Sequence, residues 1–342
     1  MKKISRRNIL KYMATGAATI ASTPFLIACQ KALQSSPEET ASTTGNPLTT
    51  GPGMTPLTSE TVSPIDQSPT LAAYPDLVVA RKASPESLVQ AALTAIGGMA
   101  RFVPQGGWVI IKPNICTSYH SYEYATTTNP WVVGALVKMC FLAGANKVQV
   151  MDSPFGGSAA DAYKKSGIAE QVQINGGEMV QMPGFMFKKI TIENALSLNQ
   201  VEIYQDVFNA DTLINVPIAK NHGLATLTLG MKNLMGLITE RQRIHQDFGN
   251  RLTDLSRTIK PTLTVIDAVR ILLRNGPTGG DLGDVQVMDT IIVSQDIVAA
   301  DSYAATLFGF QPNDLEYIRI GNQTGLGHSD LSSLDIRELT LG

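Results

Sequence analysis

Short apolar runs alternate with helical patterns from about residue 108 to residue 310. The apolar runs are continuous in Val, Ile and Leu, which is typical of strands that are buried on both faces. Strand–helix–strand alternation of this kind predicts an α/β fold, with a largely parallel, doubly wound sheet and helices on both faces. The predicted strands cover residues 108–115, 147–152, 178–181, 211–217, 262–269 and 289–295.

Two of the predicted helices begin at residues that are good N-caps. Asn129 precedes Pro130, which suits the first helical position, and this helix is expected to stop at Gly144. Asp296 is expected to cap a later helix, on which Asp301 lies among apolar residues. A buried carboxylate needs a partner, so Asp301 should meet a lysine, a backbone donor or a metal.

Polar residues stand at the carboxyl ends of four apolar runs. Ligands of open α/β sheets bind in the crevice beyond these strand ends. If the four strands are parallel neighbours, one crevice holds a lysine, two amides and two carboxylates. The alternative is that each strand simply leads into a polar loop. The residues concerned are Lys112 and Asn114, then Asp152, Asn215 and Asp267.

The segment "NVPIAKNHGLATLTLGMKNLMG" (residues 215–236) is mostly apolar but contains two lysines and a histidine. Pro217 is expected to end a strand, because proline cannot donate to the ladder. "AKNHG" is then a loop, and a helix is expected to start near Ala225. The apolar stripe of this helix would face the core through Leu227, Met231, Leu234 and Ile238.

This arrangement predicts an anion-facing group. Lys220 and His222 would lie at the positive end of the helix, where anions are favoured. Lys232 and Asn233 would lie on the helix where small neighbours let a ligand approach. Individually, a solvated Lys220, a satisfied His222 and a Lys232 that reaches solvent are the plainer alternatives. Together, in so apolar a segment, these residues favour the anion site.

Two loops carry further candidates. "TTTNP" (residues 126–130) is explained by the Asn129 cap, although its threonine hydroxyls would also suit a phosphate or carboxylate. "NGPTGGD" (residues 275–281) is glycine-rich but lacks the spacing of a P-loop or a dinucleotide fingerprint. It is interpreted as a turn or a mobile flap over the crevice, and it supplies Asn275 and Asp281.

Metal binding is one alternative for the carboxylates. Asp152, Asp267 and Asp281, with Asp301, could hold an oxygen-ligated ion such as Mg²⁺. The histidines are scattered and form no zinc motif. Besides Cys29 the chain has only Cys116 and Cys140, which cannot supply the four thiolates of an iron–sulfur cluster. A disulfide between these two is an open alternative.

The N-terminus carries the pattern of an export signal. "SRRNILK", with Arg6 and Arg7, resembles the twin-arginine signal, and "LIAC" resembles a lipobox in which Cys29 is lipidated. Residues 1–29 are therefore predicted to be a signal peptide with a lipobox. The protein is expected to use the twin-arginine export machinery and to be anchored by lipid in the cell envelope, outside the cytoplasmic membrane.

Composition separates a tether from the folded domain. Residues 30–70 are rich in Ser, Thr and Pro and are predicted to be a disordered tether, followed by an α/β domain over residues 71–342. Removal of residues 1–28 deletes five basic residues and no acidic one, so the net charge changes from −2 to −7. An acidic mature protein is a poor nucleic-acid binder, and no nucleic-acid partner is expected.

The motifs together resemble the domain of unknown function 362 family. The resemblance rests on "IIKPNI", "TTTNPWVVGALV", "GANKVQVMDSP", "INVPIAKNHGLATLTLGMKNLMGLI", "VIDAV", "NGPTGGD" and "DIVAADSYAATLFG", and runs from about residue 108 to 327. The family has no assigned chemistry. Many members carry ferredoxin-type cysteine motifs that this chain lacks, so the resemblance carries no redox role to it. The positions that match the family's polar motifs are Lys112, Asn114, Asp152, Asn215, Lys220, His222, Lys232, Asn233, Asp267, Asn275 and Asp281.

The leading hypothesis is a membrane-tethered α/β protein with a crevice for a small anionic molecule. His222 is the preferred general acid or base, because its ordinary pKa is nearest to neutrality, and Lys220 and Lys232 complete the catalytic group. Two other classes stay open: a non-catalytic solute-binding lipoprotein and a redox protein with a bound cofactor. The groups expected to bind the ligand are Lys112, Asn114, Asn215, Asn233 and Asn275.

Overall fold

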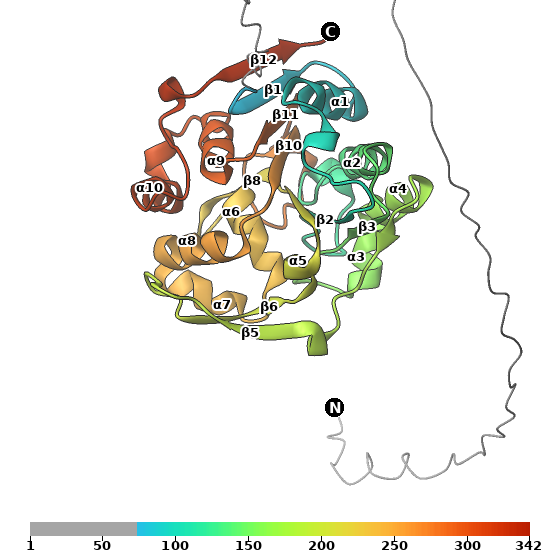
Figure 1. Ribbon diagram of the computed structural model, residues 1–342. Coiled ribbons are helices and arrows are strands. Elements are labelled where there is room, and N and C mark those ends of the chain that lie inside the picture. The colour runs from blue at the N-terminus through green and yellow to red at the C-terminus, as the bar shows by residue number, and fades with distance from the viewer. Residues whose placement is uncertain (1–73) are drawn as a thin grey trace, which may run out of the picture. The chain divides into compact units, whose positions relative to one another are not determined.

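The structure is a computed structural model, and it describes residues 74–342. The predicted signal peptide and tether lie outside the described residues. A mixed sheet runs through the middle of the described part (Figure 1). Its strands, in order across the sheet, are β12 (Ile336–Thr340), β1 (Leu77–Arg81), β11 (Val285–Ser294), β10 (Leu263–Leu272), β7 (Thr212–Val216), β2 (Trp108–Pro113), β3 (Lys147–Val150) and β4 (Glu178–Met179).

Most neighbouring strands are parallel. Strands β10, β7, β2, β3 and β4 form one parallel block, and β12 is parallel to β1. Strand β11 is antiparallel to both of its neighbours. The strands that carry or precede the polar residues singled out above are β3, β2, β7 and β10, and these are parallel neighbours as the crevice hypothesis requires. Asp267, however, lies within β10 and not at its end.

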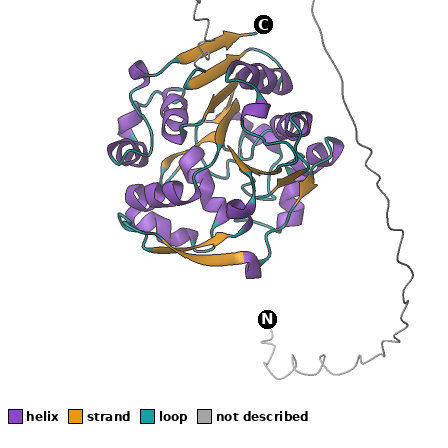
Figure 2. Cartoon of the chain, viewed as in Figure 1, coloured by secondary structure: helices purple, strands orange, loops and turns teal. Residues whose placement is uncertain are grey.

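Helices cover both faces of the sheet, which confirms the predicted fold class (Figures 1 and 2). Side chains along each strand alternate between two apolar clusters. Leu77 and Val79 belong to one cluster, whereas Val78 and Ala80 belong to the other. One face is covered by α1 (Pro85–Ala95), α2 (Pro130–Leu142), α3 (Ala159–Lys165) and α4 (Ile168–Ile174), and the other by α6 (Gly230–Asn233), α8 (Phe248–Ile259), α9 (Ile297–Thr306) and α10 (Glu316–Gln323).

The helix caps follow the sequence prediction. Asn129 accepts a hydrogen bond from the Trp131 amide at the start of α2. Asp296 accepts from the amides of Val298 and Ala299 at the start of α9. Such side-chain acceptors satisfy amides that have no partner within the helix.

The segment after Pro217 differs from the prediction. Lys220 and His222 lie on a strand, β8 (Ile218–His222), which pairs with β10 and forms an antiparallel hairpin with β9 (Thr226–Thr228). The predicted helix from Ala225 is therefore wrong over its first turn, because the hairpin satisfies these backbone groups. The helix that does form is α6, and it starts at Gly230.

Smaller elements complete the described part. Strands β5 (Phe187–Thr191) and β6 (Gln200–Tyr204) form a separate antiparallel pair. Helices α5 (Asp206–Asn209) and α7 (Arg241–Ile244) are single turns, and η6 (His245–Asp247) directly follows α7. Within residues 74–342, no helix is both long enough and apolar enough to span a membrane.

Candidate functional site

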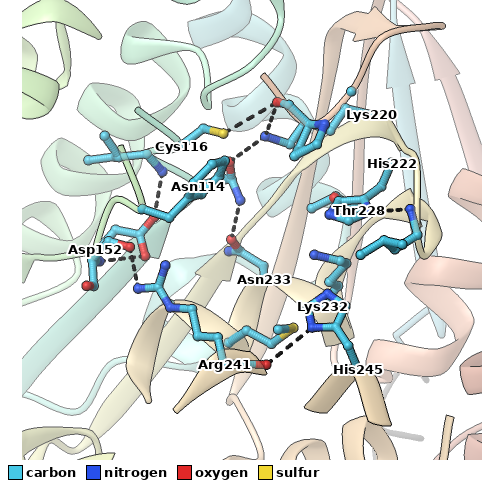
Figure 3. A pocket seen from close by; sticks show the side chains of 18 of the residues that line it. Asn114, Cys116, Asp152, Lys220, His222, Thr228, Lys232, Asn233, Arg241 and His245 are labelled. Carbon is cyan, nitrogen blue, oxygen red and sulfur yellow. Dashed lines mark hydrogen bonds between the residues drawn. The ribbon is translucent and has the colours of Figure 1, made fainter. Parts of the chain in front are cut away.

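A cavity of about 390 Å³ lies at the carboxyl edge of the parallel strands (Figure 3). Small-molecule sites in proteins typically enclose about 300–1,000 Å³. The walls come from the segments after β2 and β3, the β8–β9 hairpin, α6, α7 and the loop at residues 276–277. The polar side chains that line it include Lys112, Asn114, Cys116, Asp152, Lys220, His222, Thr228, Lys232, Asn233, Arg241 and His245.

A buried ion pair forms the floor of this cavity. The Lys112 ammonium lies 2.7 Å from Asp152 Oδ1, and both side chains are almost fully buried. Lys112 also donates to the carbonyl of Pro113 at 2.8 Å and to Asn233 Oδ1 at 2.9 Å. Burial lowers the pKa of Lys112 to about 8, although the charge of Asp152 opposes the shift. The pair is neutral in sum, so its carboxylate is not available to offset other cations.

Lys220 is buried without a carboxylate partner among the residues that the structure describes. Its ammonium donates to the carbonyl of Thr126 at 2.6 Å, and to Asn114 Oδ1 and the carbonyl of Pro277 at 3.1 Å each. All three acceptors are neutral oxygens. They satisfy the hydrogen-bonding capacity of the ammonium but leave its charge uncompensated. An anion in the cavity would supply the missing negative charge.

Three amides connect the two lysines. Asn114 donates to Asn233 Oδ1 at 3.0 Å, and Asn233 donates to Asn215 Oδ1 at 2.9 Å. Asn215 in turn donates to the carbonyl of Gly230 at 2.9 Å. Asn114 and Asn233 line the cavity, whereas Asn215 lies behind them. These amides therefore fix the positions of Lys112, Lys220 and α6 relative to one another.

Asp301 fixes the start of the helix that carries Lys232. Its two carboxylate oxygens accept from the amide of Gly230 at 2.6 Å and from the amide of Met231 at 2.9 Å. The partner required for this buried carboxylate is thus a pair of backbone donors, one of the predicted alternatives. Burial raises the pKa of Asp301 to about 7, against the effect of these two hydrogen bonds. A side chain on Gly230 would place its Cβ 2.6 Å from Asp301 Oδ1.

Lys232 faces the cavity from α6 without an oxygen partner in residues 74–342. Burial lowers its pKa to about 7, and the charges of Lys220, Arg241 and Lys112 add to this effect. The Cys116 thiol acts in the opposite direction. Lys232 is therefore a lysine that changes charge near neutrality, and it lies beside His245 in Figure 3.

His222 is held in one orientation by the β8–β9 hairpin. Its Nδ1 accepts hydrogen bonds from the amides of Leu224 (3.1 Å) and Ala225 (3.2 Å), which places the hydrogen of the neutral ring on Nε2. Burial and the charges of Lys232 and Lys220 lower its pKa to about 3. His222 is therefore a neutral ring near pH 7, and it closes the hairpin through Nδ1. Its predicted role as a general acid or base stays a prediction.

Other polar groups in the cavity were not predicted from the sequence. Arg241 donates to the carbonyl of Ser153, and His245 Nδ1 lies 3.3 Å from the carbonyl of Arg241. The Thr228 hydroxyl is buried without a partner among residues 74–342. The spacing of Arg241 and His245 at i and i+4 was the signal for a shared helical face. Thr228 gives no such signal, because the sequence predicts a helix at its position.

The predicted metal ligands do not come together. Asp267 accepts from the amides of Asn129 (2.6 Å) and Val269 (3.0 Å), and Asp281 is an exposed cap that accepts from the Gly283 amide at 2.8 Å. Asp152 is bound to Lys112. Within residues 74–342, no group of three or more His, Cys, Asp or Glu side chains is arranged to hold a metal ion.

The side chains of the two candidate loops, residues 126–130 and 275–281, mainly stabilise the loops themselves. Asn275 donates to Asp284 at 2.5 Å and does not line the cavity, whereas the neighbouring Gly276 and Pro277 do. The hydroxyls of Thr127 and Thr128 donate to the carbonyls of Asn114 (2.7 Å) and Val216 (2.8 Å). Both hydroxyls are thus committed to loop structure. Cys116 and Cys140 are free thiols.

The fold and this cavity define an α/β protein with a cationic, ligand-sized site at the carboxyl edge of a mixed sheet. The chain belongs to the family described as domain of unknown function DUF362, whose model matches residues 109–306. This match confirms the family resemblance of the motifs between β2 and α9.

Several known proteins are similar to the chain. A thylakoid-associated protein of Synechocystis sp. is 28% identical over 243 residues, which is 68% of this chain and 73% of that protein. The lactate racemase apoprotein from Thermoanaerobacterium thermosaccharolyticum aligns with a TM-score of 0.40 and 13% identity, over 62% of this chain and 53% of that one. A protein from Thermotoga maritima aligns with a TM-score of 0.38 and 11% identity, over 66% and 59%. The chain spans little more than half of either solved structure.

Proposed function

We propose that the protein is an enzyme that binds a small organic anion in this cavity and uses Lys232 in its chemical step. The observation that carries the proposal is the state of Lys232, which faces the cavity without an oxygen partner in the described residues and has a pKa of about 7. Groups whose pKa is shifted toward neutrality by burial and neighbouring charges are frequent in catalytic sites.

The charge balance of the cavity supports an anionic ligand. Asp152 is committed to Lys112, while Lys220 and Arg241 bind only neutral oxygens within residues 74–342. With Lys232 protonated, the cavity therefore holds an excess of positive charge. A small carboxylate or phosphate would offset this excess and would give Lys232 a charged hydrogen-bond partner.

Isothermal titration calorimetry with a panel of small carboxylates and phosphate tests the binding step. We expect Lys232→Met to weaken binding at least tenfold, because the variant keeps the volume of the side chain but removes the amine. Lys188→Met is the matched control, since Lys188 is exposed on β5. Equal affinities in the wild type and in both variants would contradict the proposal.

Hydrogen exchange into the bound anion tests the catalytic step. Proton NMR in deuterated water should show deuterium entering a carbon-bound position of a bound panel anion, and Lys232→Met should stop this exchange. Tight binding without exchange for every bound anion would contradict the catalytic step and favour the solute-binding alternative.

We also propose that the protein is exported by the twin-arginine route and anchored through a lipid on Cys29. The support is the sequence pattern at Arg6, Arg7 and Cys29. Changing both arginines to lysine preserves the charge and should keep the protein inside the cell. Cys29→Ser should release the exported protein from the membrane fraction. Membrane association that is independent of Cys29 would contradict the anchor.

A further inference from the structure

The lysines of the cavity differ in one chemically important respect. Lys112 and Lys220 each donate to three oxygens, which is the full hydrogen-bonding capacity of an ammonium. Lys232 meets no such oxygen within the described residues. Two lysines thus have a full set of oxygen acceptors, while the third has a lone pair that can become free.

The groups around Lys232 favour the neutral amine. Lys220, Arg241 and Lys112 repel its charge, and only the Cys116 thiol acts in the opposite direction. His222 and His245 are also close, and the charge of Lys232 lowers the pKa of each. A desolvated lysine beside other cations is the usual form of an amine nucleophile that attacks carbonyl groups.

Groups that can hydrogen-bond a ligand surround the same amine. The hydrogen bonds at Nδ1 leave His222 with an N–H at Nε2 and leave His245 with a free Nε2 acceptor. The Thr228 hydroxyl, buried without a partner in residues 74–342, also lines the cavity. The site therefore provides an amine without an oxygen partner among the described residues, a hydrogen-bond donor at His222, an acceptor at His245 and a hydroxyl at Thr228.

We propose that Lys232 forms a Schiff base with a small carboxylate that carries a ketone or aldehyde carbon, such as a 2-oxo acid. This inference rests on the proposed function, because the excess cationic charge of the cavity selects the carboxylate and Lys232 reacts with the carbonyl. It names the substrate class that anion binding alone leaves open.

The reaction balances without an oxidant or reductant. The nitrogen lone pair of Lys232 forms a bond to the carbonyl carbon, and the π pair moves to the oxygen, which takes a proton from the nitrogen. The carbon–oxygen bond then breaks, and the oxygen leaves as water with the second amine hydrogen. The product is an imine between Lys232 and the carbon chain of the ligand, with one water released.

Reductive trapping tests the inference. The full protein is incubated with pyruvate, glyoxylate or 2-oxoglutarate and sodium cyanoborohydride, and the products are analysed by intact mass spectrometry and peptide mapping. We expect a single reduced adduct at Lys232 with at least one of the three probes. Lys232→Arg should lose the adduct and keep its far-ultraviolet circular dichroism, whereas Lys188→Met should retain it.

Calorimetry with the same probes and with lactate, the hydroxyl analogue of pyruvate, separates the two proposals. Binding of the 2-oxo acids without a trapped adduct at Lys232 would overturn the Schiff base and leave anion binding intact. Equal labelling of Lys232 and of exposed lysines would also overturn it. Absence of binding by lactate and by all three probes would overturn both the anion site and the inference that rests on it.

Discussion

Asp152 divides its carboxylate between the Lys112 ammonium, 2.7 Å from Oδ1, and the Ile115 amide, 2.6 Å from Oδ2. Asp152 follows β3, and Lys112 lies at the carboxyl end of the neighbouring parallel strand β2. The ion pair therefore joins the carboxyl ends of these strands and sets the floor of the cavity. Its charge is internally balanced, so the anion-binding capacity of the site depends on the other cations.

Removing one partner of this pair should destabilise the protein strongly. Asp152→Asn leaves the Lys112 charge buried without a counter-charge, and such changes typically cost about 3–5 kcal/mol. Urea denaturation followed by circular dichroism measures the free energy of unfolding. The double variant Lys112→Met/Asp152→Asn should recover part of the loss. A cost of less than about 1 kcal/mol for the single variant would show that the pair is not a structural element of the native state.

Gly236 is predicted to be intolerant of any side chain. A Cβ at this position would lie 2.0 Å from Asp152 Oδ1 and 2.5 Å from the Lys112 ammonium. Gly236→Ala should therefore cost about 1–3 kcal/mol through overpacking and should weaken anion binding as well. Gly184→Ala is the control, because nothing lies within 4 Å of its Cβ. Equal unfolding free energies for the two variants would contradict the close packing around the ion pair.

Anion affinity should fall as the pH rises through 7. An anion binds more tightly to protonated Lys232, whose pKa is about 7 in the folded protein. Above this pH each unit should reduce the affinity by up to about tenfold, because binding must first protonate the amine. Calorimetry with lactate between pH 6 and 8 measures the slope. Lys112, with a pKa of about 8, titrates in part of this range, so the slope that is lost in Lys232→Met is the contribution of Lys232.

His222→Ala should reduce stability and leave this pH dependence in place. The ring closes the β8–β9 hairpin by accepting from the amides of Leu224 and Ala225, so its loss should cost about 1–3 kcal/mol. Its pKa of about 3 excludes a change of charge near neutrality. A variant with normal stability but no pH dependence of binding between pH 6 and 8 would restore His222 as the titrating group.

Several strand ends were predictable because an apolar run and the polar residue that follows it are local features of the sequence. Lys112 and Asn215 both belong to the cavity side of the sheet, and β2 and β7 are parallel neighbours as expected. Asp267 was predicted at a strand end, yet it lies within β10, on the face opposite to that of Lys112 and Asn215, and it accepts from the amide of Asn129. Side chains along a strand alternate between the two faces of the sheet, so an error of one residue assigns a side chain to the wrong face. A polar residue after an apolar run does not show which face its side chain occupies.

The β8–β9 hairpin and the positions of Arg241 and His245 in the cavity were not predictable in this way. A short antiparallel hairpin and a helical turn compete for the same apolar residues between Ile218 and Leu237, and tertiary pairing with β10 decides between them. The apolar stripe assigned to the helix is nevertheless buried in the core. Arg241 and His245 reach the cavity only because the chain folds back after α6, a contact that local sequence does not encode.

Proton uptake on anion binding tests the central claim most directly. Lactate is titrated into the protein at pH 7.5 in two buffers with different enthalpies of ionisation, and the difference in heat gives the number of protons taken up. The account predicts uptake of a fraction of a proton by the wild type, because the bound anion raises the pKa of Lys232, and no uptake by Lys232→Met. Binding without uptake, or the same uptake in both proteins, would contradict an anion site that depends on Lys232.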